Sequence, residues 1–250
     1  MNVICDIDGV VYRGDRLLPG SDLALRRVLD AGIGLWFATN NSTQSPAKVS
    51  AKISRITGVE IPPESIVTSS QAAVTMLGGD VGPVMVLGSE GIHAALSEVG
   101  IESTDDPRQA SALLVGLDWD LDYDRLTRAA DAVRFGARFI ATNTDPTFPI
   151  ADGLLPGGGA CVAAVQATTG VAPEIAGKPH QPMRDLLRAK GIGAAWVIGD
   201  RLDTDVAMAR SEEDWKSILV LTGVTARSET AGADHVVPDL ASAVDLVVSA

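Results

Sequence analysis

Four short polar segments of this 250-residue chain carry residue types that could do chemistry together. Each segment begins where an apolar strand or turn stops. If the strands are parallel neighbours, their carboxyl ends meet at one edge of a sheet, and the four segments form one site. In chain order they are Asp6-Ile7-Asp8-Gly9, Thr39-Asn40, Gly177-Lys178-Pro179 and Gly199-Asp200-Arg201-Leu202-Asp203-Thr204-Asp205.

The carboxylates of these segments predict a site for a hard divalent cation. Asp6 and Asp8 are two residues apart on a strand, so both side chains can face the same pocket. Together with Asp200 they form an oxygen-rich set of the kind that favours Mg²⁺, which is held by a few carboxylates, waters and a substrate phosphate oxygen. A cation at this position would offset the carboxylate repulsion and keep a nucleophilic carboxylate ionised.

The remaining polar groups suit phosphoryl transfer, which needs positioning and neutralisation of charge on the phosphate oxygens. Thr39, the Asn40 amide and Lys178 could supply both. A carboxylate nucleophile divides hydrolysis into two displacements through an acyl phosphate. Asp8 would protonate the leaving oxygen in the first displacement and take a proton from water in the second.

Alternating strand and helix patterns position these segments. Apolar β-branched runs predict strands at Val3–Asp8, Ile33–Ala38, Val84–Gly88, Ala112–Gly116, Arg138–Asn143, Ala195–Asp200 and Ser217–Thr222. Patterns with helical spacing lie between them and include a closing helix near Leu240–Val248. This alternation indicates α/β architecture.

Composition narrows the class of partner and the compartment. The formal net charge of −12 disfavours nucleic acid and anionic membrane surfaces as partners. Cys5 and Cys161 are far apart in apolar or small-residue surroundings, which indicates buried thiols in a reducing, cytoplasmic compartment. No secretory signal is evident, and no apolar run approaches the roughly 20 residues of a membrane span.

At the four segments the sequence resembles the haloacid dehalogenase superfamily, and more narrowly its NagD-like phosphatases with an inserted α/β cap. Further similarity lies in Gly9-Val10-Val11-Tyr12, Leu18-Pro19-Gly20, Ala141-Thr142-Asn143-Thr144-Asp145 and Leu219-Val220-Leu221-Thr222-Gly223-Val224. The resemblance implies a Rossmann-like, doubly wound parallel-sheet core at residues 1–77 and 173–250, with a cap domain at residues 78–172. The implied activity is magnesium-dependent hydrolysis of a small phosphorylated metabolite.

The resemblance also implies a role for each site residue. Asp6 is the nucleophile and a metal ligand, and Asp8 is the general acid/base and binds the metal through its carbonyl. Asp200 is a metal ligand, and Asp205 supports the metal or its waters. Thr39, Asn40 and Lys178 hold the phosphate, while Asn143 and Asp145 of the cap shape substrate access. Relatives often pair through their caps, which makes a homodimer an expectation, although the sequence identifies no dimer surface.

Other readings of the same residues stay open. A phosphometabolite-binding regulator could keep the fold without catalysis, whereas a signalling receiver would be about half this length. A dehalogenase would not need the second carboxylate, so the presence of Asp8 argues against that activity. A phosphonate-cleaving enzyme would need a lysine in the cap for a Schiff base, and no lysine lies between residues 78 and 172. Asp203 and Thr204 fit a helix cap as well as a substrate contact.

Three other features of the sequence receive no catalytic role. His180, next to the lysine segment, is a candidate for substrate contact. The Ser211–Lys216 segment departs from the family pattern, and we expect a local change in a surface turn. The alternating Asp118, Asp120, Asp122 and Asp124 are interpreted as a solvated turn of the cap, because Ala129 stands where a calcium loop needs a glutamate.

Overall fold

The computed structural model describes residues 1–79 and 81–249. Its larger sheet has six strands, and all neighbouring strands pair in parallel. β1 (Asn2–Cys5), which leads into Asp6, is hydrogen-bonded on both sides, to β12 (Ala195–Gly199) and to β4 (Gly34–Thr39). The spatial order is β14 (His235–Val237), β13 (Trp215–Val220), β12 (Ala195–Gly199), β1 (Asn2–Cys5), β4 (Gly34–Thr39) and β5 (Ile66–Thr68).

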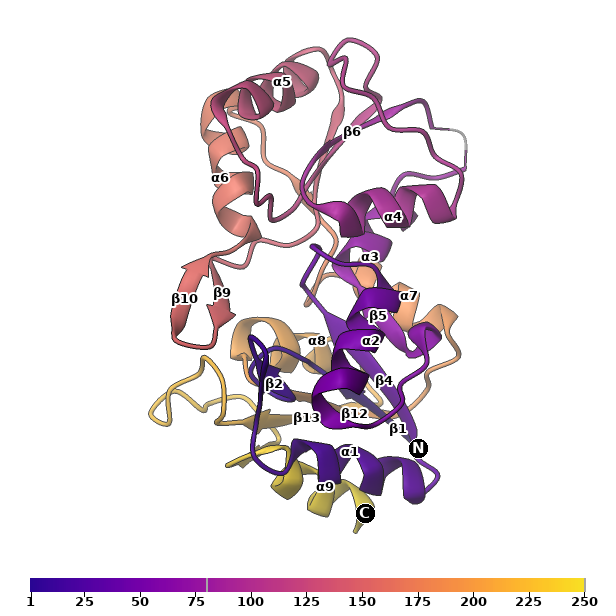
Figure 1. The fold of residues 1–250 in the computed structure, drawn as a ribbon, viewed down its shortest axis with the longest axis vertical. Helices are drawn as coiled ribbons and strands as arrows, with labels where there is room; N and C mark the ends of the chain where they lie inside the picture. The colour runs from indigo at the N-terminus through magenta and orange to yellow at the C-terminus, as the bar shows by residue number, and fades with distance from the viewer. Residues whose placement is uncertain (80, 250) are drawn as a thin grey trace.

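Helices cover both faces of this sheet, because both faces of its strands are apolar. Val3 and Cys5 of β1 point to one face, and Ile4 points to the other. The first face packs against α1 (Ser21–Asp30), α2 (Pro46–Thr57) and α9 (Leu240–Val248), and Figure 1 shows α1 and α9 lying together. The second face packs against α3 (Ser69–Thr75), α7 (Gln181–Ala189) and α8 (Ala207–Arg210).

Local sequence signals explain where several helices begin and end. The Ser45 hydroxyl accepts from the Lys48 N–H at the start of α2, and Gly58 ends that helix in the left-handed region. Asp239 caps α9, whose bounds agree with the predicted Leu240–Val248. The parallel six-stranded sheet with helices on both faces confirms the predicted doubly wound α/β fold.

A second, smaller unit is built on a four-stranded parallel sheet. Its apolar core on one side is continuous with the α3 face of the larger sheet. α4 (Glu90–Glu98) covers that side, and α5 (Tyr123–Arg134) and α6 (Gly158–Thr169) cover the other. The spatial order of its strands is β11 (Glu174–Ile175), β8 (Arg138–Ala141), β7 (Ala112–Val115) and β6 (Val84–Leu87).

The domain limits of 1–77 with 173–250 and of 78–172 stay a prediction. β11 lies two residues past the predicted cap boundary, and it pairs with β8 of the smaller sheet. The chain therefore still belongs to the smaller sheet at Ile175, three residues before Lys178. Lys178 therefore lies where the chain passes from the smaller sheet back to the larger unit.

Two hairpins were not predicted. β9 (Thr147–Ile150) pairs antiparallel with β10 (Gly153–Pro156), and Figure 1 shows this hairpin projecting from the smaller unit toward the loops of the larger one. β2 (Tyr12–Arg13) and β3 (Arg16–Leu17) form a short hairpin after Asp8. The Asp152-Gly153 pair between apolar residues is a hairpin signal that sequence reasoning could have used.

Two peripheral interpretations can be compared with the structure. Asp118 is buried, with 6% exposure, and its carboxylate pairs with Arg125, so its assignment to a solvated turn was wrong. In the Ser211–Lys216 segment, Glu212 accepts from Arg184 and Arg188, and Trp215 starts β13 in the core. Only Ser211–Asp214 therefore forms the predicted turn, and it is tied to α7.

Both cysteines are buried free thiols, as predicted. Within the described residues, no helix combines the length and the apolar character needed to cross a bilayer.

Candidate active site

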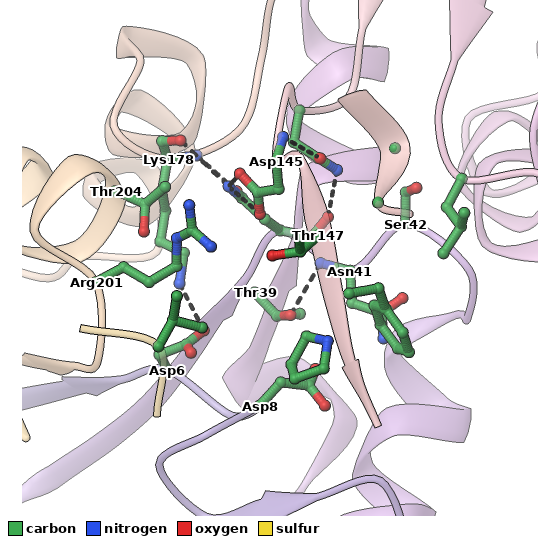
Figure 2. Close-up of a pocket in the computed structure, with 18 of the residues that line it drawn as sticks. Asp6, Asp8, Thr39, Asn41, Ser42, Asp145, Thr147, Lys178, Arg201 and Thr204 are labelled. Atoms are coloured by element: carbon green, nitrogen blue, oxygen red, sulfur yellow. Dashed lines mark hydrogen bonds and ion pairs between the residues drawn. The ribbon is translucent and has the colours of Figure 1, made fainter. Parts of the chain in front are cut away.

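The four polar segments converge on one cavity at the carboxyl edge of the larger sheet. Asp6 follows β1, Thr39 ends β4 and Asp200 follows β12, three neighbouring strands. Lys178 reaches the same place from the loop after β11 (Figure 2). The smaller unit closes the other side of the cavity with Asn143, Asp145 and the start of β9.

Lys178 joins two of the predicted carboxylates. Its Nζ donates to Asp6 Oδ1 over 2.6 Å, to Asp205 Oδ1 over 2.7 Å and to the Ala38 carbonyl over 2.8 Å. The three side chains are buried, with between 2% and 11% exposed. Residues 172 positions apart in sequence, Asp6 and Lys178, are therefore in direct contact.

Three carboxylates form a candidate metal site. One oxygen from each of Asp6, Asp200 and Asp205 lies within 4.8 Å of the others. Asp200 Oδ2 accepts from the Val224 N–H over 2.6 Å, whereas Asp200 Oδ1 is buried without a hydrogen-bond partner among the described residues. A buried carboxylate oxygen without a donor is costly unless a cation is bound beside it. The donor set of oxygens alone fits a hard divalent cation.

Glycine backbone surrounds this oxygen cluster closely. A Cβ at Gly223 would lie 1.7 Å from Asp200 Oδ2, and one at Gly9 would lie 2.8 Å from the same oxygen. Gly9 also has a φ of +89°, which side chains rarely tolerate. The glycines after Asp8 and after Thr222 therefore leave room for the carboxylate of Asp200.

Burial and charge set the electrostatics of the cluster. Burial raises the pKa of Asp6 well above its usual value, and the charge of Lys178 opposes that rise. Burial also raises the pKa of Asp200 to about 7, with repulsion from Asp205 adding to the rise. Burial by itself would lower the pKa of Lys178. The neighbouring carboxylates of Asp205 and Asp6 outweigh burial and raise this pKa above its usual value. The single ammonium of Lys178 does not balance three carboxylates. A divalent cation would neutralise the remaining negative charge.

Asp8 lines the same cavity but stands apart from the oxygen cluster. It is half-buried, and its carboxylate is not one of the three that lie within ligand distance of one another. Burial raises the pKa of Asp8, which favours the protonated acid that a leaving group needs. Its place in the cavity is compatible with the predicted acid/base role.

Thr39 and Asn40 both line the cavity, but their side chains make different use of their hydrogen bonds. Thr39 Oγ1 accepts from the Asn41 N–H over 3.0 Å, which leaves its own O–H able to donate to a ligand. The Asn40 side chain is instead used within the protein. Its Nδ2 donates to Asp145 Oδ1 over 3.0 Å and to the Lys178 carbonyl over 3.2 Å, and its Oδ1 accepts from the Lys178 N–H.

Asn143 and Asp145 therefore contact the larger unit through Asn40. Asn143 Nδ2 donates to the Asn40 carbonyl over 2.6 Å, and Asn143 Oδ1 accepts from the Asp145 N–H. Both residues line the cavity. The side chain of Asn40 thus holds the cap segment and the lysine loop in place, and it has no amide hydrogen left for a phosphate.

Arg201 and Asp203 show a pairing that the sequence left open. Asp203 accepts from Arg201 Nε over 3.1 Å and from Nη2 over 2.8 Å, so it holds the arginine and does not cap a helix. Thr204 lines the cavity, and His180 does not belong to its lining. Residues 202–206 form a π-helical turn, a feature that is frequent at functional sites.

Other cavity-lining residues lay outside the predicted set. They come from the loop after β4, from β9, from the start of α6 and from the loops after β7, β12 and β13. The hairpin signal could have indicated those of β9, and a position next to Asp200 could have indicated Arg201. They are Asn41, Ser42, Leu117, Thr147, Phe148, Pro149, Gly157, Gly158, Arg201 and Val224.

Comparison with known proteins agrees with this site. Residues 3–102 match a family described as haloacid dehalogenase-like hydrolase, and residues 175–243 match one described as HAD-hydrolase-like. These two ranges contain all four polar segments and leave most of the smaller unit between them.

Curated relatives with similar sequences are phosphatases. The chain is 35% identical over 242 residues to D-glycerol 3-phosphate phosphatase of Mycobacterium tuberculosis, covering 94% of this chain and 66% of that enzyme. It is 34% identical to an acid sugar phosphatase of Staphylococcus haemolyticus, covering 90% of this chain and 87% of the relative.

A solved structure extends the comparison to the fold. Glycerol phosphate phosphatase from Mycobacterium tuberculosis in complex with magnesium matches with a TM-score of 0.85 and 33% identity, over 96% of this chain and 75% of that one. The motifs, the fold and the relatives agree: this chain belongs to the haloacid dehalogenase-like hydrolases and, within them, to the NagD-like phosphatases.

Proposed function

We propose that this chain hydrolyses a small phosphorylated metabolite through an aspartyl-phosphate on Asp6, with Mg²⁺ as cofactor. The observation that carries the proposal is the convergence of Asp6, Lys178, Asp200 and Asp205 at one buried point. The relatives named as glycerol 3-phosphate and acid sugar phosphatases support a small phosphorylated substrate.

Mg²⁺ would be held by the carboxylates of Asp6 and Asp200 and by the Asp8 carbonyl, with Asp205 supporting the metal or its waters. When bound, the cation supplies charge neutralisation to the phosphate oxygens and to the cluster. Lys178 supplies a second positive charge beside Asp6 and fixes the orientation of that carboxylate. Thr39 can donate its hydroxyl hydrogen to the phosphate.

The proposed reaction has two displacements. In the first, an oxygen of Asp6 forms a bond to phosphorus, the bond from phosphorus to the leaving oxygen breaks, and Asp8 gives that oxygen a proton. In the second, water attacks the same phosphorus while Asp8 takes its proton, and the Asp6 carboxylate is released with inorganic phosphate. The two displacements regenerate both carboxyl groups.

Substitution of Asp6 tests this scheme. Asp6→Asn is nearly isosteric but lacks a nucleophilic oxygen, so it is expected to abolish phosphate release from glycerol 3-phosphate and 4-nitrophenyl phosphate with magnesium. Asp30→Asn, at an exposed position at the end of α1, is the matched control and is expected to keep full activity. Retention of more than about a tenth of the wild-type rate by Asp6→Asn would refute the covalent scheme.

A wild-type protein that binds phosphorylated metabolites without releasing phosphate would favour the regulator reading. The cytoplasmic location and the homodimer through the cap remain predictions of the sequence. Size-exclusion chromatography with light scattering tests the homodimer.

A further inference from the structure

Arg201 is fixed in the wall of the cavity with part of its guanidinium unused. Its Nε and Nη2 donate to Asp203, whose side chain is 65% exposed, while the Arg201 side chain is only 14% exposed. Nη1 takes no part in either bond to Asp203. Figure 2 shows Arg201 on the same side of the cavity as Asp6, Lys178 and Thr204, with Ser42 on the opposite side. The arginine is thus oriented by one carboxylate and has a donor left.

The other cation of the cavity has no donor left. An ammonium has three hydrogens, and Lys178 uses its three for Asp6, Asp205 and the Ala38 carbonyl. The amide hydrogens of Asn40 are used for Asp145 and for the Lys178 carbonyl. Among the charged side chains that line the cavity in the described chain, Arg201 is therefore the one cation able to donate to a bound molecule.

Asp145 provides a hydrogen-bond acceptor for the same region. Its two oxygens accept from Asn40 Nδ2, and a carboxylate has about four acceptor positions, so both oxygens can accept again. Burial raises the pKa of Asp145, and the charge of Arg201 is the largest influence that opposes the rise. Both side chains line the same cavity.

A hydroxyl group matches this donor and acceptor together, because it can accept from a guanidinium while it donates to a carboxylate. An alkyl or aryl group offers neither contact and would leave Nη1 of Arg201 and the remaining acceptor positions of Asp145 unused. We propose that Arg201 is a substrate-specificity residue that, with Asp145, binds a hydroxyl group of a phosphorylated polyol. This inference rests on the proposed function and names the substrate class of the same site.

Two phosphonates test the proposal on the magnesium-loaded wild-type enzyme. 3,4-Dihydroxybutylphosphonate and butylphosphonate differ only in two hydroxyl groups, and their carbon–phosphorus bonds make them inert to phosphate-ester hydrolysis. Isothermal titration calorimetry is expected to give about tenfold or tighter binding of the diol by the wild-type enzyme, since a site built to bind a hydroxyl disfavours an analogue that lacks it.

Substitution of Arg201 is expected to remove this preference selectively. Arg201→Met should bind the two phosphonates within about threefold of each other, and its Kd for butylphosphonate should stay within about threefold of wild type. Arg201→Gln is the second variant if the methionine variant does not fold, and the same result is expected. Arg134→Met on α5 makes the same charge change at a half-exposed ion pair and should keep the diol preference.

Three results would overturn the proposal. Wild-type enzyme without a diol preference would exclude hydroxyl recognition. Equal weakening of both phosphonates in Arg201→Met would assign the arginine to the phosphate group, and a preference that survives the substitution would remove it from recognition. Phosphate release from glycerol 3-phosphate by the wild-type enzyme is measured separately, so a failure of the proposed chemistry is distinguishable from a failure of recognition.

Discussion

Lys178 Nζ lies 2.6 Å from Asp6 Oδ1, and both side chains are almost fully buried. The same ammonium lies 2.7 Å from Asp205 Oδ1. Without Lys178, two buried carboxylates would face each other with no cation from the protein. The lysine therefore contributes both to the stability of the apo fold and to the orientation of Asp6.

We predict that Lys178→Met abolishes turnover and lowers the free energy of unfolding by about 3–5 kcal/mol in the absence of metal, as for removal of one partner from a buried ion pair. Urea unfolding at pH 8 and phosphate release with magnesium measure the two effects. Lys190→Met, at the exposed end of α7, is the control and should change neither. A loss of stability below about 1 kcal/mol would contradict the prediction.

Asn40→Ala is predicted to lower the free energy of unfolding by about 1–3 kcal/mol, because groups of Asp145 and Lys178 lose their hydrogen-bond partner. Asn40→Asp should be less stable still, since it replaces a donor to Asp145 with a second carboxylate. Urea titration compares the two variants, with Asn2→Ala, at a half-buried position on β1 away from the cavity, as control. Equal stability of Asn40→Asp and Asn40→Ala would show that the contact with Asp145 contributes little.

Asp8→Asn is predicted to affect substrates according to their leaving group. Release of glycerol from glycerol 3-phosphate needs a proton on the leaving oxygen, so kcat should fall at least about 100-fold. Release of 4-nitrophenolate needs little protonation, so kcat for 4-nitrophenyl phosphate should fall much less. The two substrates serve as controls for each other in one variant, and equal losses would remove Asp8 from the acid role.

The raised pKa of Asp200 predicts that the stability of the metal-free protein depends on pH. Its pKa is raised to about 7 in the folded state, against about 3.9 in an unfolded chain. The folded protein therefore keeps a proton that the unfolded chain releases, so this contribution to stability is complete below about pH 4 and is lost as the pH rises through about 7.

The free energy of unfolding of wild type should thus fall more steeply than that of Asp200→Asn between about pH 4 and 7. Urea titrations at a series of pH values with a chelator measure the free energy of unfolding of both proteins. Subtracting one pH profile from the other removes the contributions of the carboxyl groups that the two proteins share. Magnesium should reduce it, because a bound cation favours the ionised form. Parallel pH profiles of the two proteins without metal would disprove this assignment.

The fold class, the family and the enzyme class could be predicted from the sequence alone, and these predictions are confirmed. The buried carboxylate cluster fits the predicted magnesium cofactor. The family and the enzyme class followed from the motif resemblance, whereas the fold class followed from local patterns. Apolar runs with polar ends identify strands of a doubly wound sheet, and parallel topology places the residues that follow those strands, such as Asp6 and Asp200, at one edge. The helix at Leu240–Val248 was likewise readable from its periodicity and its Asp239 cap.

Only the tertiary structure decided which donors remain available in the site. Lys178 and Asn40 have the residue types of phosphate ligands, yet their hydrogens are used by groups 27 to 172 positions away in sequence. Asp118 was assigned to solvent, although Arg125 and the cap fold bury it. Residue type fixes how many hydrogen bonds a side chain can make, but the distances between remote segments determine which of those bonds the protein itself already makes.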